Sequence, residues 1–131
     1  MYEIIMGVDG NQERARAQSE NVTGLPVDEN SIRVTIVHVF ADNPRGKSAG
    51  QVKSVREAAE RLEQAGIEVE IQGSGGDPAA EILGVAEEVD AELISVAGRK
   101  RSPSGKVIFG SVSQSILLKT DLPVMISGRA D

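Results

Sequence analysis

The order of its apolar segments is the feature that most constrains the fold of this 131-residue chain. Short runs rich in β-branched residues alternate with stretches whose apolar residues recur at helical spacing. The runs predict five strands, at residues 3–8, 32–40, 67–72, 91–97 and 122–127. The strict apolar and polar alternation of residues 67–72 is typical of an edge strand. Strands that alternate with helices predict right-handed crossovers and a parallel sheet covered on both faces.

Two of the intervening helices carry clear signals. Between the second and third strands an apolar stripe ends before Gly66, a glycine at the position of a helix C-terminal cap; its members are Val52, Val55, Ala59 and Leu62. Between the third and fourth strands, Asp77 and Pro78 are typical of an N-cap followed by the first helical position. The inward stripe of that helix is expected to be Ile82, Val85, Ala86 and Val89. The preceding glycine-rich run, residues 73–76, is interpreted as a turn.

The other two helices are predicted on weaker grounds. The segment after Gly110 carries Ile116 and Leu117 and is expected to end near residues 119–120. Residues 11–20 are rich in charge and glutamine, with only Ala15, Ala17 and Val22 nearby to bury. We predict a helix there because a parallel crossover requires one. The result is a single doubly wound, flavodoxin-like α/β domain.

Topology then predicts where a ligand binds. In open parallel sheets, ligands bind beyond the carboxyl ends of the strands, at the point where the strand order reverses. With the order 3-2-1-4-5, that point lies between the first and fourth strands. The loops that leave these strands begin at Asp9 and Gly98, so we expect the two to face one crevice.

The second of these loops has the character of an anion site. Gly98 ends a strand, Gly110 and Ser111 open a helix, and the basic side chains between them are Arg99, Lys100, Arg101 and Lys106. Helix N-terminal amides beside glycine favour phosphate. These positive charges contrast with the whole chain, which carries a formal net charge of −6. A local positive potential of this kind attracts an anionic ligand. A nucleotide is the predicted ligand, and a merely solvated loop is the alternative.

Three residues allow two interpretations. The Asp9 carboxylate can accept hydrogen bonds from a ribose hydroxyl or an adenine amino group, or it can cap the first helix. Ser111 can contact phosphate, or it can form a capping box with Gln114. His38, the one histidine, is expected in the core or the crevice wall rather than as a catalytic base.

Composition excludes several classes of function. The chain has no cysteine, and its N-terminus resembles neither a signal peptide nor a membrane span, so we expect a cytoplasmic protein. The acidic balance argues against nucleic-acid binding. No histidine and carboxylate cluster suggests a metal site, and no candidate catalytic residue emerges. The basic loop holds no carboxylate to activate water, so fast hydrolysis is not predicted.

Three separated motifs resemble the universal stress protein family over essentially the whole chain, residues 1–131. They are V-D-G at residues 8–10, G-D-P-A-A-E-I-L at 76–83 and G-S-V-S at 110–113. The resemblance implies five parallel strands and a homodimer, commonly formed through the last strand, here Leu122 to Ser127. It also implies that some members bind ATP while others do not, and that those which bind it carry a G-x2-G-x9-G-[ST] loop. The cofactor expected for this chain is ATP, alone or with Mg²⁺.

Carried over to this chain, the resemblance places Asp9 and the backbone near Val39 beside adenine. It places Ala97 and Gly98 at the ribose, and the helix start from residue 110 to 112 at the phosphates. The predicted nucleotide-binding residues are Val8, Asp9, Val39, Ala97, Gly98, Arg101, Gly110, Ser111 and Val112. The chain departs from the pattern at Arg101, which replaces the second glycine and precedes Gly110 by eight intervening residues rather than nine.

Two classes of function follow. The first is a dimeric stress-response protein that binds ATP or a related adenine nucleotide as a regulatory ligand. The second is a nucleotide-free dimeric scaffold whose basic loop binds an anionic protein partner, with Arg101 marking lost ATP binding. Slow ATP hydrolysis or autophosphorylation is a third, weaker hypothesis.

Overall fold

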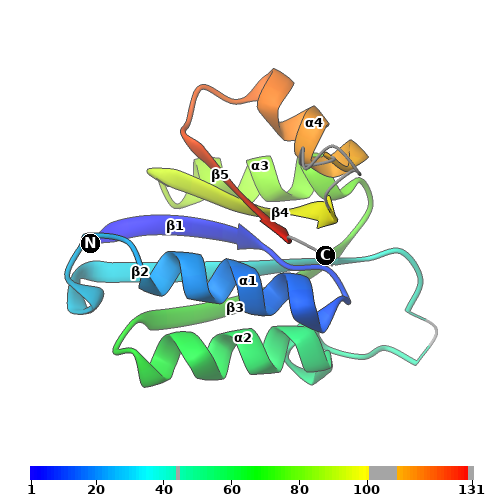
Figure 1. Ribbon diagram of the computed structural model, residues 1–131. Helices are drawn as coiled ribbons and strands as arrows, with labels where there is room; N and C mark the ends of the chain where they lie inside the picture. Colours follow the sequence, from blue (N-terminus) through cyan, green and yellow to red (C-terminus); the bar gives the residue numbers. More distant parts are fainter. Residues whose placement is uncertain (44, 101–108, 130–131) are drawn as a thin grey trace.

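The sheet has the predicted topology. The computed structural model describes residues 1–43, 45–100 and 109–129. Its five strands are all parallel and lie in the order β3-β2-β1-β4-β5 (Figure 1). This confirms the doubly wound α/β fold, with β3 at an edge. The strands are β1 (Tyr2–Gly7), β2 (Ile32–Phe40), β3 (Glu68–Gly75), β4 (Leu93–Lys100) and β5 (Val124–Arg129).

In the described part of the chain, four α-helices cover the sheet. They are α1 (Gln12–Thr23), α2 (Lys53–Gln64), α3 (Pro78–Glu88) and α4 (Ser111–Lys119). Helices α1 and α2 lie on one face, and α3 and α4 lie on the other (Figure 1). Two short 3-10 helices, η1 (Glu29–Ser31) and η2 (Ala49–Gln51), precede β2 and α2. Among the described residues, no helix is long and apolar enough to cross a membrane.

The two faces of the sheet hold two apolar cores, because successive strand side chains point to opposite faces. In β1, Ile4 and Met6 pack beneath α1 and α2, whereas Ile5 packs beneath α3 and α4. All three side chains are at most 1% exposed. Helix residues that complete the first core are Ala15, Val22, Val55, Ala58, Ala59 and Leu62; those that complete the second are Ala79, Ile82, Ala86 and Ile116.

The strongest local signals in the sequence are confirmed. Gly66 adopts a φ of +92°, which glycine tolerates and other residues rarely adopt, directly after the C-cap of α2. The Asp77 side chain accepts a hydrogen bond of 2.9 Å from the backbone N–H of Ala80, and Pro78 opens α3. The signals that end α2 and begin α3 are therefore local in the sequence.

Two details of the sequence analysis are wrong. Residues 73–75 belong to β3 and pair with residues 38–40 of β2, so the turn is reduced to Gly76, which has a φ of +104°. The ends of β1, β3, β4 and β5 differ by one to three residues from those expected, because ladder pairing rather than hydrophobicity ends a strand, whereas β2 has the predicted bounds. Helix α4 ends at Lys119, as expected, and is anchored by the fully buried Ile116, while Leu117 is 42% exposed.

Candidate functional site

The carboxyl ends of β1 and β4, which pair directly, open onto a cavity of about 150 Å³. Its walls come from the ends of three strands and from the first turns of α3 and α4. Most of the lining side chains are aliphatic, and the cavity therefore suits an apolar or flat ligand group. The lining residues are Gly7, Val8, Asp9, Val37, Val39, Pro78, Ile82, Val96, Ala97, Val112 and Ser113.

A second cavity of about 80 Å³ adjoins the first and has a different character. The two share four lining residues: Asp9, Ala97, Val112 and Ser113. The second cavity adds Arg14 from α1, together with Gly110 and Ser111 at the start of α4. The first amides of a helix have no partner within the helix and carry its partial positive charge. This cavity therefore suits an anionic group.

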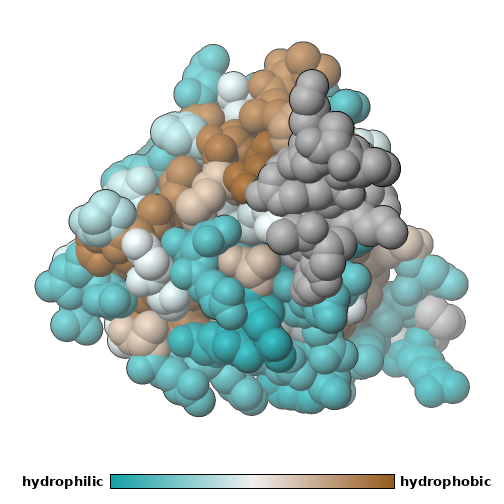
Figure 2. Space-filling view, viewed as in Figure 1, coloured by the Kyte–Doolittle hydropathy of each residue, from teal (hydrophilic) through white to brown (hydrophobic). Residues whose placement is uncertain are grey.

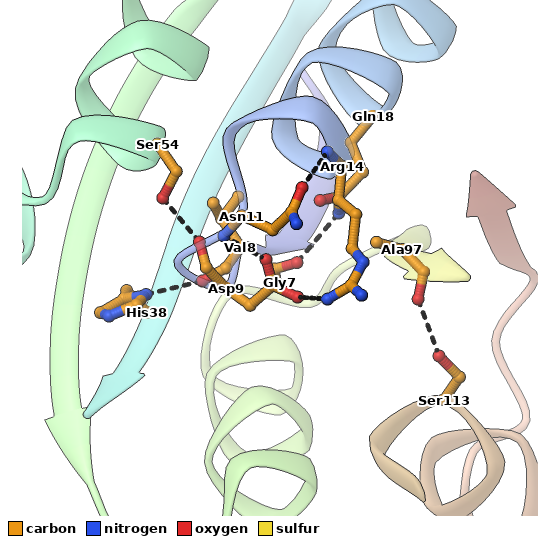
Figure 3. A network of polar contacts seen from close by, with 10 residues as sticks. All are labelled: Gly7, Val8, Asp9, Asn11, Arg14, Gln18, His38, Ser54, Ala97 and Ser113. Atoms are coloured by element: carbon orange, nitrogen blue, oxygen red, sulfur yellow. Dashed lines mark hydrogen bonds and ion pairs between the residues drawn. The ribbon is translucent and has the colours of Figure 1, made fainter. Parts of the chain in front are cut away.

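Side chains from three elements hold the end of β1 in place (Figure 3). The Gln18 side chain in α1 donates from Nε2 to the Gly7 carbonyl, at 2.9 Å. His38 in β2 donates from Nδ1 to the Val8 carbonyl, at 2.7 Å, and the hydroxyl of Ser54, just inside α2, donates to the Asp9 carbonyl, at 2.6 Å. Three successive carbonyls are thus fixed by side chains, which makes the backbone that carries Asp9 rigid.

The Asp9 carboxylate is itself engaged on both oxygens. Oδ1 accepts from the backbone N–H of Asn11 at 2.8 Å, and Oδ2 lies 3.0 Å from Nη1 of Arg14. The N-cap of α1 is Asn11, whose Oδ1 accepts from the Arg14 amide at 2.9 Å. The interpretation of Asp9 as the N-cap is therefore wrong. Its side chain, half exposed, remains at the mouth of the cavities.

The start of α4 differs from the predicted capping box. Gly110 is the N-cap, and its carbonyl accepts the first helical bond from the amide of Gln114 at 3.1 Å. Ser111 is the first helical residue, so it is not the capping serine. The serine that orients this helix is Ser113, whose hydroxyl donates to the Ala97 carbonyl of β4 at 3.1 Å. That bond fixes the helix N-terminus against the strand end.

Seven of the nine predicted binding residues line the two cavities: Val8, Asp9, Val39, Ala97, Gly110, Ser111 and Val112. Gly98 is buried in β4 beside Ala97 and is not among the residues that line these two cavities. Arg101, with Lys106, lies outside the described residues. The structure therefore brings together residues from both halves of the chain, as the topology predicted.

Sequence analysis missed several contributors to the site: Arg14, Gln18, Ser54, Pro78, Ile82 and Ser113. One signal could have found Gln18, which is fully buried. It lies three residues after Ala15 and four before Val22, and therefore on the buried stripe of α1. His38 is buried, in agreement with the expectation that it lies in the core or the crevice wall, and it does not line either cavity. It is 8% exposed and packs edge to face on Phe40, with ring centroids 4.7 Å apart.

Comparison with known proteins identifies relatives. The model of the universal stress protein family matches residues 1–127. A universal stress protein of Mycolicibacterium smegmatis is 38% identical over 104 residues, covering 79% of this chain and 74% of the relative. The solved structure of a universal stress protein from Archaeoglobus fulgidus is 30% identical, with a TM-score of 0.74 over 96% of this chain and 98% of that one.

A further solved structure is similar in fold. It is the universal stress protein from Archaeoglobus fulgidus in complex with dAMP, which is 23% identical with a TM-score of 0.68. The likeness covers 96% of this chain and 97% of that one.

Proposed function

Because this chain belongs to the universal stress protein family, we propose that it binds ATP or a related adenine nucleotide as a regulatory ligand. The binding site is the pair of adjoining cavities between β1 and β4. The contrast between them carries the proposal: one is mostly aliphatic, the other lies at a helix N-terminus, and they share four lining residues. A nucleotide has the same division, with a flat base and sugar at one end and a phosphate at the other.

The residues take roles that follow from their positions. Val8 and Val39 flank the base in the aliphatic cavity, and the rigid Asp9 carboxylate accepts from the adenine amino group or a ribose hydroxyl. Ala97, which lines both cavities, passes beside the ribose. The amides of Ser111 and Val112 face the phosphate, with Gly110 allowing close approach. The complex of a protein of the same fold with dAMP supports an adenine nucleotide as the ligand.

Calorimetry on protein stripped of small molecules tests the proposal directly. Titration with ATP, with and without Mg²⁺, and with AMP should show saturable binding at one site per chain. Gly110→Val should abolish binding, since a branched side chain would stand where the phosphate approaches. The φ of Gly110 is −81°, which valine also adopts, so the substitution tests ligand approach rather than backbone strain.

Gly84→Val is the matched control. Gly84 lies in the middle of α3, is exposed, and has no atom within 4 Å of the position of an added Cβ. It should bind nucleotide as the wild type does. Absence of binding by the wild type would contradict the proposal and would favour the nucleotide-free scaffold, whose basic loop includes Arg101.

We also propose that the chain forms a homodimer through β5 and the exposed side of α4. Strand β5 lies at an edge of the sheet, and an edge strand presents unpaired backbone groups that can pair with a second copy. Hydrophobic residues form a band where β5 and α4 lie (Figure 2). Leu118 is 87% exposed and Leu117 42% exposed, while Met125 and Ile126 are half-buried. Burial of such a surface favours association.

Sedimentation analysis tests the dimer. Met125→Lys introduces a charge into the edge strand and Leu118→Glu into the exposed apolar surface, and each should shift the protein toward monomer. Ile71→Lys is the control, because it places a lysine on β3 at the opposite edge, where Ile71 is 37% exposed. A wild type that sediments as a monomer at all concentrations would contradict the proposal, as would an equal effect of the control.

A further inference from the structure

Arg14 is an unexpected component of the site. Among the described residues that line the two cavities, it is the one cation. It comes from the first turn of α1, an element to which the sequence analysis assigned no ligand contact. Its side chain is 27% exposed and shares the smaller cavity with Gly110, Ser111 and Val112.

The position is unfavourable for the helix itself. Arg14 is the third residue of α1, where the partial positive charge of the helix N-terminus opposes a cation and favours an acid. The Asp9 carboxylate, 3.0 Å from Nη1, offsets this repulsion. Helix α4 also begins at this cavity, so two helix N-termini contribute a positive electrostatic potential there. The charge of Arg14 adds to that potential.

The guanidinium has capacity for a further partner. Arginine carries five N–H donors in a planar fork, and the Asp9 bond at Nη1 engages one of them. In Figure 3 the guanidinium lies between Asp9 and the end of β4 at Ala97, with Ser113 beyond. The ion pair is partly exposed, and pairs of this kind are weak, so a phosphate can compete for the guanidinium or share it. Bidentate binding of phosphate is the contact for which arginine is best suited.

We propose that Arg14 determines specificity for charge at this site: it binds the phosphate attached to the ribose and makes the site prefer adenine nucleotides over adenosine. This inference rests on the proposed nucleotide function. Without Arg14, Asp9 is released and remains able to contact the base or ribose. Binding of the uncharged nucleoside is therefore maintained, while binding of the nucleotide is weakened.

The test compares the affinities of AMP, ATP and adenosine in the wild type and in three variants. Arg14→Gln should weaken AMP and ATP binding roughly tenfold or more, the range expected for a charge-assisted hydrogen bond. Its adenosine affinity should stay within about threefold of the wild type or become tighter. Arg14→Lys keeps the charge but not the planar fork, and should lose only part of the nucleotide preference.

Arg16→Gln is the matched control, since Arg16 is exposed on the same helix and does not line either cavity. It removes the same charge and should change nucleotide affinity by less than about twofold. Unchanged nucleotide affinity in Arg14→Gln would overturn this inference but not the proposed function. So would an equal loss of adenosine affinity, or an equal effect of Arg16→Gln. A wild type that binds neither nucleotides nor adenosine would overturn the proposed function, and this inference with it.

Discussion

Helices α1 and α2 pack side by side on the same face of the sheet, and each has 12 residues, yet they bury different chemistry. The buried side of α2 is mainly aliphatic: Val55, Ala58, Ala59 and Leu62, with Ser54 near its start. The buried side of α1 is half polar: Ala15, Gln18, Ser19 and Val22. Because burial of apolar side chains drives folding, we expect α2 to contribute more than α1 to the free energy of folding.

The polar residues of α1 explain the difference. Gln18 holds the Gly7 carbonyl, Arg14 holds the Asp9 carboxylate, and Asn21 donates to the Ser127 hydroxyl of β5 at 2.8 Å. Among the described residues, helix α2 contributes one comparable bond, from Ser54 to the Asp9 carbonyl. One helix therefore supplies mainly stability, and its neighbour supplies mainly the geometry of the site. The following substitutions test that division of roles.

The largest expected effect on stability is in α2. Leu62 of α2 is fully buried between its helix and the sheet. Leu62→Ala should lower the free energy of unfolding by about 2–5 kcal/mol, measured by urea denaturation. Glu63→Ala is the control, because a truncation at the exposed neighbouring residue of the same helix should change it by less than about 0.5 kcal/mol. Nucleotide affinity of the folded Leu62→Ala protein should be unchanged. A loss of affinity without a loss of stability would contradict the assigned role of α2.

A smaller effect on stability is expected in α1. Gln18→Leu keeps most of the side-chain volume but removes the Nε2 donor, which leaves the Gly7 carbonyl without that partner. Gln18 Oε1 has no hydrogen-bond partner among the described contacts, so its removal offsets part of the loss. We expect a loss of about 1 kcal/mol in unfolding free energy. Nucleotide affinity should nonetheless fall several-fold, because the strand end that carries Asp9 is loosened.

Ser19→Ala serves as the matched control for Gln18→Leu. Ser19 is buried on the same helix, and its hydroxyl donates within the helix to the Ala15 carbonyl at 2.9 Å. Its removal should affect stability to a similar degree and leave nucleotide affinity unchanged. Equal affinities in the two variants, measured by calorimetry, would show that α1 does not set the geometry of the site.

The same contrast explains which parts of the fold could be predicted. The signals for α2 and α3 are local: an apolar stripe, Gly66 after one helix, and Asp77 and Pro78 at the start of the next. The signals for α1 are not local. Gln18 is buried because its partners are the carbonyl of Gly7 and Ser95, which lies 77 residues away. A polar residue with distant partners does not differ in the sequence from a solvated one.

The site was predictable where topology determined it. Strand order placed Asp9, Ala97 and the start of α4 together, because the ends of adjacent parallel strands must meet. The cap of α4 was not predictable to the residue. Both Gly110 and Ser111 are favourable N-caps, and the bond from Ser113 to the Ala97 carbonyl, a tertiary contact, accompanies the choice of Gly110. Tertiary contacts decide between local alternatives of similar energy.

The smallest expected effect on stability is at Asp9 itself. Asp9→Asn removes the ion pair with Arg14 but leaves an oxygen that can accept from the Asn11 amide. Because the Asp9 side chain is half exposed, we expect a change of less than about 1 kcal/mol in unfolding free energy, decreasing as salt is added. Asp121→Asn, an exposed substitution that changes net charge equally, controls for that change. A loss of several kcal/mol would show that this pair stabilises the fold, and that α1, like α2, acts mainly as a structural support.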